Sequence, residues 1–145
     1  MLYIKNGLCI DPGTGMEKIC DILTEGGRIL KMGERLEETE EFRRLPRHEI
    51  QTIDAEGYIV APGFVDVHVH FRDPGFTDKE DILTGAAAAA AGGFTSVVMM
   101  ANTKPAVDTV ETLRCVLEKG AKTGIHVYSC ANVTMGMKGK ELTDM

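Results

Sequence analysis

An alternation of apolar, strand-like segments with helix-like segments through the second half of the chain most constrains how it can fold. Apolar segments cover residues 64–70, 94–100 and 125–130, and helical patterns cover 78–91 and 108–120. Parallel strands need a long connection, usually a helix, whereas antiparallel strands can be joined by a tight turn. The β-α-β-α-β order therefore predicts an α/β fold with parallel strands and crossover helices.

Local signals mark the ends of the two predicted helices. Thr77 followed by Glu80 has the spacing of a capping box, so the first helix is expected to start beside Thr77. Gly92-Gly93 is expected to end that helix. The second helix is expected to carry three apolar side chains on one face: Val110, Leu113 and Leu117.

The first third of the chain predicts short strands joined by turns. Asn6-Gly7 and Gly26-Gly27 each separate two strand-like segments and are expected to form hairpin turns. A small antiparallel sheet is the simplest interpretation, and such a sheet needs a partner surface to be stable. Residues 34–49 are rich in charged side chains and are interpreted as a solvated helix or loop.

Composition excludes several classes of protein. The 145 residues are 43% hydrophobic and 26% charged, and the net charge of −6 gives no basic surface for nucleic acid. No apolar run approaches the roughly 18 residues of a membrane span, and the N-terminus lacks the apolar core of a secretory signal. The four cysteines form no C-x-x-C pair and are expected as reduced, buried thiols. We therefore expect a cytoplasmic protein that binds neither nucleic acid nor membrane.

Candidate chemistry is concentrated in the segment DVHVHFRDPG, residues 66–75. Side chains alternate between the faces of a strand, so Asp66, His68 and His70 are expected on one face. Two neutral imidazoles two residues apart at a strand end can ligate one metal ion. Asp66 would either orient an imidazole or belong to the polar packing of the strand. Two histidines on one strand face also occur as polar packing, which is the alternative to a metal site.

Arg72 and Asn102 form a second candidate pair. Arg72 follows the histidines, and Asn102 lies just past the second predicted strand. Both are therefore expected at the same mouth, where the strands of βα barrels carry their active sites. A guanidinium fork and an amide N–H are well suited to bind a carboxylate. The alternatives are a surface salt bridge for Arg72 and a turn-forming role for Asn102.

The run APGFVDVHVHFRDPG, residues 61–75, resembles the first-strand signature of the amidohydrolase superfamily. Within it, Arg72 before Pro-Gly, together with Asn102, resembles the dihydroorotases of the longer, bacterial class I type. The segments GGFTS at 92–96 and KGKELT at 138–143 fit the same family. The resemblance is strong over the last two thirds of the chain and loose over the N-terminal strands.

The resemblance implies roles for four residues. His68 and His70 would ligate zinc, with one or two ions in a complete site, and Arg72 and Asn102 would bind the substrate carboxylate. The implied reaction is the reversible hydrolysis of the cyclic amide of (S)-dihydroorotate to N-carbamoyl-L-aspartate in pyrimidine biosynthesis. The implied partners are this small-molecule substrate and, for a full-length form, a second copy or a transcarbamylase. No catalytic residue of the family falls within this chain.

The resemblance also implies the architecture. Residues 1–54 would form N-terminal strands of a small composite β-sandwich, and residues 55–145 would form the first βα units of a TIM-type (β/α)₈ barrel. A complete barrel needs about 250 residues, so the chain is expected to be an incomplete N-terminal fragment that is inactive alone. Open edges and an uncovered apolar face predict that it aggregates.

Two alternative functions stay open. A hydantoinase or allantoinase would use the same histidine pair on a related cyclic ureide, but without the combination of Arg72 and Asn102. A non-catalytic, dihydroorotase-like partner subunit would support another protein instead of reacting with a substrate. Retention of both His68 and His70 favours an enzyme over such a partner.

Overall fold

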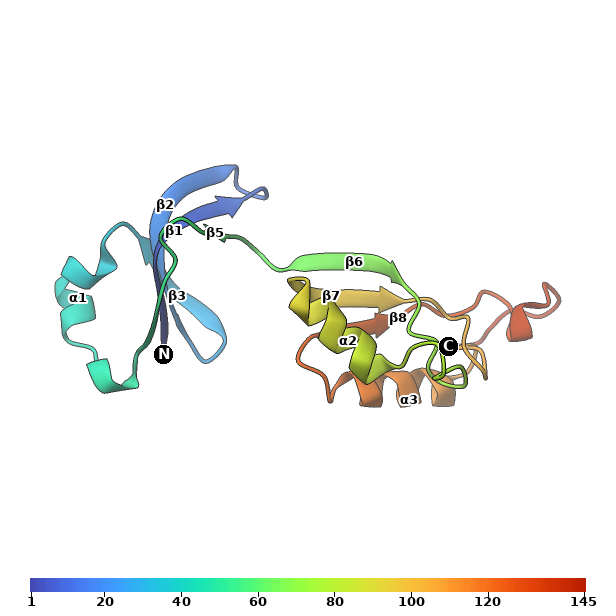
Figure 1. Ribbon diagram of the computed structural model, residues 1–145. Coiled ribbons are helices and arrows are strands. Elements are labelled where there is room, and N and C mark those ends of the chain that lie inside the picture. The colour runs from blue at the N-terminus through green and yellow to red at the C-terminus, as the bar shows by residue number, and fades with distance from the viewer. The chain divides into compact units, whose positions relative to one another are not determined.

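The computed structural model describes residues 1–145 and divides them into two compact units, Met1–Pro62 and Gly63–Met145 (Figure 1). Each unit is built around its own β-sheet. Strand β5 (Ile59–Val60) belongs to the first unit, because it pairs with the first strand of the N-terminal sheet. None of the helices is long and apolar enough to cross a membrane.

The N-terminal unit holds a five-stranded sheet in the order β3-β2-β1-β4, and β5 also pairs with β1. Its first four strands are β1 (Leu2–Asp11), β2 (Met16–Glu25), β3 (Arg28–Gly33) and β4 (Gln51–Asp54). Strands β1, β2 and β3 are antiparallel as predicted, whereas β4 and β5 join β1 in parallel. The hairpin predicted at Gly26-Gly27 is confirmed, and both glycines take the positive φ that a two-residue turn requires.

The hairpin predicted at Asn6-Gly7 is wrong. Strand β1 continues through both residues, and its register with β2 shifts between Ile4 and Gly7, as in a β-bulge. Asn6 takes a φ of 62°, and its backbone N–H donates to the Asp21 carboxylate at 3.0 Å. A Cβ on residue 7 would lie 2.5 Å from Cγ2 of Val60, which favours glycine there. The Asn-Gly pair therefore bends strand β1 instead of reversing the chain. Strand β2 pairs with β1 on both sides of the bulge.

The charged segment 34–49 is only partly the solvated region that its composition suggests. It forms two short 3-10 helices, η1 (Leu36–Glu38) and η2 (Arg47–Glu49), and one helical turn, α1 (Glu40–Arg43). Leu36 and Phe42 are buried in a cluster with the sheet, and the ring centroids of Phe42 and Tyr3 are 4.6 Å apart. These two apolar side chains therefore anchor an otherwise charged segment on the sheet.

The second unit confirms the predicted β-α-β-α-β order. Its parallel sheet has the order β6-β7-β8, and a helix connects each successive pair of strands. The elements are β6 (Phe64–Val69), α2 (Ile82–Ala91), β7 (Phe94–Met99), α3 (Val110–Gly120) and β8 (His126–Ser129), followed by the 3-10 turn η3 (Met135–Met137). Both helices pack on one face of the sheet, where Val97, Ile82 and Val116 are fully buried in a common core (Figure 1).

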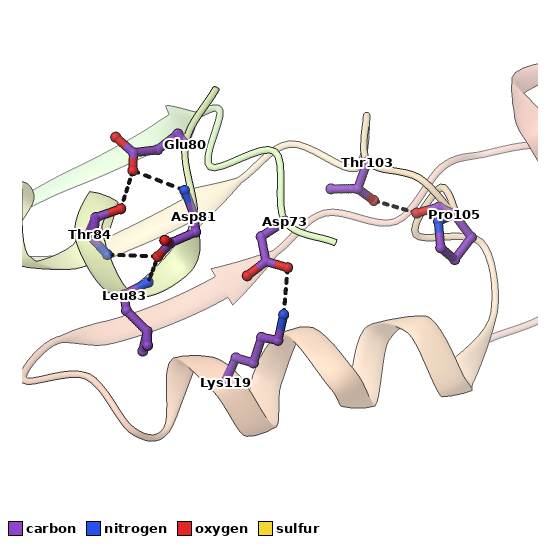
Figure 2. Close-up of polar contacts among 8 residues, drawn as sticks. All are labelled: Asp73, Glu80, Asp81, Leu83, Thr84, Thr103, Pro105 and Lys119. Atoms are coloured by element: carbon purple, nitrogen blue, oxygen red, sulfur yellow. Dashed lines mark hydrogen bonds and ion pairs between the residues drawn. The ribbon is translucent and has the colours of Figure 1, made fainter. Parts of the chain in front are cut away.

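Helix α2 is capped by Asp81 and not by the predicted Thr77–Glu80 box. Figure 2 shows the Asp81 carboxylate accepting hydrogen bonds from the backbone N–H groups of Leu83 (2.7 Å) and Thr84 (2.9 Å). The hydrogen bond from Thr84 is the main cause that holds the pKa of Asp81 below its usual value. Glu80 instead accepts from the Thr84 hydroxyl and from the backbone N–H of Asp81. The box prediction fails because Thr77 lies in the loop before the helix.

The buried face of helix α3 only partly matches its predicted apolar face, of which Leu113 alone packs against the core. Its buried side chains are Thr112, Val116 and Gly120. A Cβ on Gly120 would lie 2.8 Å from Cβ of Val127 on β8, so the glycine lets helix and sheet approach closely. Val110 and Leu117, from the predicted apolar face, are exposed instead. The side of α3 that meets the sheet therefore includes a close approach at Gly120 and the apolar packing of Val116.

Candidate active site

The expected site residues follow the carboxyl ends of β6 and β7. His68 lies on β6, and His70 comes directly after its last residue. Asn102 lies in the loop after β7. The two strand ends are held side by side, because the backbone N–H of Met100 donates to the carbonyl of Val69 at 2.9 Å. The two-residue period of a strand places both histidines on one face, and the pairing of β6 with β7 brings the loop after β7 beside them.

The two imidazoles lie against each other. The ring centroids of His68 and His70 are 5.1 Å apart, the ring planes are inclined at 61°, and both side chains are exposed. The Asp66 carboxylate accepts a hydrogen bond from the backbone N–H of His68 at 2.9 Å. Asp66 therefore holds the backbone of the strand rather than an imidazole, at a point where the register of β6 with β7 is irregular.

Asn102 contacts the second histidine directly. Its Oδ1 lies 3.1 Å from Nδ1 of His70. An amide oxygen only accepts hydrogen bonds, so in this contact Nδ1 of His70 carries the proton and donates it to Asn102. The lone pair of a neutral imidazole is then on Nε2, the nitrogen left free to bind a metal ion. The sequence predicts that the two residues share a mouth, but it contains no signal for this contact.

Arg72 follows the histidines in a loop with an unusual backbone. It takes a φ of 62°, in the left-handed region, and its side chain is half-buried. Its guanidinium takes part in none of the ion pairs of the chain. The alternative interpretation of Arg72 as a surface salt bridge is therefore wrong. The residues on either side of it, Phe71 and Asp73, are both buried.

The donor set at the strand ends fits part of a zinc site. Two adjacent imidazoles with free Nε2 atoms match the nitrogen ligands that zinc prefers. No group of three or more His, Cys, Asp or Glu side chains in the chain is arranged to hold a metal ion. The remaining histidines lie elsewhere: His126 stacks on Tyr128 of β8, and His48 sits beside Glu49 in the first unit. The chain therefore offers two candidate ligands at this position, His68 and His70.

Sequence reasoning missed an ion pair beside the site. Figure 2 shows Lys119 of α3 reaching the Asp73 carboxylate, with Nζ 2.6 Å from Oδ1. Asp73 is only 4% exposed. This hydrogen bond raises the pKa of Lys119 above its usual value, against the effect of burial. Asp73 and Lys119 are 46 residues apart, and a pair this far apart in sequence leaves no spacing signal.

The loop that carries Arg72 is also tied to the loop that carries Asn102. The backbone N–H of Lys104 donates to the carbonyl of Pro74 at 2.8 Å. Gly75 has a φ of 96°, and a Cβ there would lie 2.0 Å from the carbonyl oxygen of Lys104. Only glycine allows this approach. The two loops therefore form one connected edge above the strands.

Comparison with known proteins shows relatives along the whole chain. The chain is 54% identical over 144 residues, 99% of its length, to the dihydroorotase of Streptococcus pneumoniae serotype 4. Among solved structures it is similar to L-hydantoinase (dihydropyrimidinase) from Arthrobacter aurescens, with a TM-score of 0.77 and 23% identity over 92% of this chain and 28% of that one. D-hydantoinase (dihydropyrimidinase) from a Thermus species gives a TM-score of 0.70 and 28% identity over 97% and 29% of the two chains. The fold of this chain is therefore that of a part of the hydantoinases.

The chain spans about a third of the length of the curated relatives it matches, 32% for the Streptococcus pneumoniae protein. The family described as dihydro-orotase-like matches residues 57–145, which is more than half of the chain. This match covers the histidine pair, Arg72 and Asn102 together. The chain belongs to the dihydro-orotase-like family.

Proposed function

We propose that this chain supplies part of the active site of a cytoplasmic dihydroorotase. The enzyme reversibly hydrolyses the cyclic amide of (S)-dihydroorotate to N-carbamoyl-L-aspartate, a step of pyrimidine biosynthesis. The observation that carries the proposal is the meeting of His68, His70 and Asn102 at the carboxyl ends of two parallel strands. The 54% identity to a named dihydroorotase, over 99% of this chain and 32% of that protein, supports this choice of substrate.

His68 and His70 would hold zinc through Nε2. When bound, zinc polarises the amide carbonyl and lowers the pKa of water, which promotes hydrolysis near neutral pH. The chain's own contribution is to fix the direction of the imidazoles. Asn102 accepts the Nδ1 proton of His70, and the backbone around His68 is held by Asp66. Partners of this kind orient the ligands of a metal ion.

Arg72 and Asn102 would bind the carboxylate of the substrate. The guanidinium of Arg72 has no internal ion pair, so its donors are available to a bound anion. Asn102 has an amide group with two functions: its oxygen accepts from His70, while its NH₂ group remains a donor. One side chain would therefore link the metal ligands to the substrate and set the position of the ring.

The surrounding architecture is part of the proposal. Residues 55–145 would form the first βα units of a (β/α)₈ barrel, and residues 1–54 would form strands of a composite β-sandwich. Val65 and Val67 of β6 are exposed apolar side chains at this edge of the sheet, which supports the proposal that further strands or helices pack beside it. For a full-length form we also propose a homodimer or a complex with a transcarbamylase.

The test uses a hybrid enzyme, in which residues 1–145 replace the matching part of the Streptococcus pneumoniae dihydroorotase. We expect the hybrid to bind zinc and to hydrolyse dihydroorotate in preference to hydantoin and allantoin. The parent enzyme is the positive control, and the hybrid with His68→Ala and His70→Ala is the negative control. Preference for hydantoin or allantoin would support the alternative cyclic amidohydrolase. A folded, zinc-loaded hybrid without any activity would instead support the non-catalytic partner.

A further inference from the structure

We infer that Lys119 is a positioning residue that neutralises Asp73 and thereby keeps the neighbouring Arg72 free for the carboxylate of the substrate. This inference rests on the proposed function, because it assigns Arg72 to substrate binding. It adds a residue of α3, far from the strand ends in sequence, to the residues on which substrate affinity depends.

The first step is the burial of Asp73. The Asp73 side chain is 5% exposed, and Lys119 contacts its carboxylate at 2.6 Å (Figure 2). A buried carboxylate without a partner is strongly unfavourable, so a cation must compensate it. The side chain of Lys119 is 40% exposed and reaches in from the helix to do so. No other side chain of the chain forms an ion pair with Asp73.

The second step is the position of Arg72 next to this carboxylate. Arg72 is the covalent neighbour of Asp73 and is a cation whose guanidinium matches a carboxylate better than a lysine does. Arg72 nevertheless forms no ion pair, and the partner of Asp73 is Lys119. Without Lys119, Asp73 would be an unpaired internal anion in the same loop as Arg72, directly next to it in the chain. An internal anion and a substrate carboxylate would then compete for the same guanidinium.

The third step is that the loop itself is held by other contacts. Phe71 packs on Gly85 of α2, where a Cβ would lie 2.5 Å from the ring. On the other side, the carbonyl of Pro74 accepts from Lys104 at 2.8 Å. The loop is therefore fixed at both ends of the Arg72–Asp73 pair. We therefore expect that loss of the Lys119 charge changes which group the Arg72 guanidinium binds, while the loop stays folded.

The experiment compares Lys119→Met, Asp73→Asn and the double variant in the hybrid enzyme, with Lys122→Met as a matched control on an exposed lysine. For Lys119→Met we expect the KM for dihydroorotate to rise about tenfold, with kcat within about twofold of the unchanged hybrid. The double variant removes the competing anion, so its KM should return to within about threefold of the unchanged hybrid. Lys122→Met should change neither constant.

A merely structural role for the ion pair predicts a different pattern. It would lower the active fraction, and therefore kcat, without moving KM, and the double variant would be at least as impaired as Lys119→Met. Either result would overturn the inference. An unchanged hybrid that fails to hydrolyse dihydroorotate would instead count against the proposed function.

A second measurement uses the 145-residue chain itself and needs no activity. The side-chain Nε–H NMR signal of Arg72 should shift in Lys119→Met, because Asp73 then engages the guanidinium. The signal should keep its original position in the double variant. The absence of a shift in a folded Lys119→Met chain would also overturn the inference.

Discussion

At the scale of single residues, Asn102 has the contact with the greatest consequence. Its Oδ1 lies 3.1 Å from Nδ1 of His70, in a loop joined by the Lys104–Pro74 hydrogen bond to the loop of Arg72. One amide therefore borders both a proposed metal ligand, His70, and the proposed carboxylate position. Substitution of such a residue should lower metal affinity and substrate affinity together. Substitution of a residue with only one of these roles should lower only one of the two affinities.

We expect Asn102→Ala in the hybrid enzyme to weaken zinc binding by roughly 10- to 100-fold, because the hydrogen bond that orients His70 is lost. The KM for dihydroorotate should rise as well, because one carboxylate donor is removed. Competition with a zinc chelator measures the first effect, and steady-state kinetics measure the second. Asn132→Ala is the matched control, since Asn132 bonds a backbone carbonyl and no histidine. Unchanged zinc affinity in Asn102→Ala would contradict the orienting role.

The cysteines divide into two classes that composition does not separate. All four are free thiols as expected, but only Cys9 and Cys20 are buried, whereas Cys115 and Cys130 are exposed. The expectation that all of them are buried is therefore wrong for the second pair. Burial, followed by the hydrogen bond with Cys9, raises the pKa of Cys20 to about 12.

Alkylation should reveal this division, because the thiolate is the reactive form. In the folded chain at mildly alkaline pH, iodoacetamide should modify Cys115 and Cys130 and leave Cys9 and Cys20 intact. All four should react after denaturation, which serves as the control. Mass spectrometry of the digested chain identifies the modified residues. Equal labelling of the four thiols in the folded chain would show that the first sheet does not protect its cysteines.

At the scale of elements, helix α2 depends on the carboxylate of Asp81. Asp81→Ala should lower the midpoint of thermal unfolding by a few degrees, because two backbone N–H groups lose their acceptor. The pKa of Asp81 is lower in the folded state than in the unfolded one, so its contribution is present above the unfolded value. It is lost as the pH falls through the folded pKa. The difference between the two proteins should therefore shrink in acid.

Circular dichroism melts over a pH series would measure this effect. Asp78→Ala is the matched control, because Asp78 is an exposed acid before the helix and caps no backbone group. A pH-independent loss of stability in Asp81→Ala would show that the cap hydrogen bonds are not responsible.

The close approach of the two site loops gives a second prediction at this scale. Gly75→Ala places a Cβ against the carbonyl of Lys104 and also strains a positive φ. Gly139→Ala strains a positive φ without any atom within 4 Å, so it isolates the backbone effect. We expect Gly75→Ala to lower the free energy of unfolding by about 1–3 kcal/mol more than Gly139→Ala. Urea denaturation measures both, and equal losses would mean that the loops can separate freely.

At the scale of the whole molecule, the second unit exposes apolar side chains on an edge strand. Val65 and Val67 of β6 are 61% and 67% exposed, and β6 lies at the edge of its sheet. Exposed apolar edge strands favour association between chains. The 145-residue chain should therefore self-associate as its concentration rises. With only two proposed metal ligands, it should also be inactive by itself.

Light scattering coupled to size-exclusion chromatography tests this behaviour. The double substitution Val65→Thr and Val67→Thr keeps the β-branched shape but adds hydroxyl groups, so it should reduce self-association. Val133→Thr changes a valine that is 77% exposed outside the strands, and it should have little effect. Equal effects of the two changes would mean that the edge strand is not the contact surface.

Local sequence patterns determined much of this protein. The order of strands and helices in the second unit follows from apolar segments and helical patterns, and the Gly26-Gly27 turn follows from residues that tolerate positive φ. The pairing of His68 with His70 follows from the two-residue period of a strand. These features depend on neighbours in the chain, so the chain alone is sufficient to predict them.

Only the tertiary structure decided the features that depend on distant residues. Asn6-Gly7 became a bulge because β2 pairs with β1 on both sides of it, and Gly120 of α3 is buried where the helix closely approaches Val127 of β8. The His70–Asn102 hydrogen bond and the Asp73–Lys119 ion pair join loops and helices far apart in sequence. Such contacts are selected by packing and by the need to pair buried polar groups, which no local pattern records.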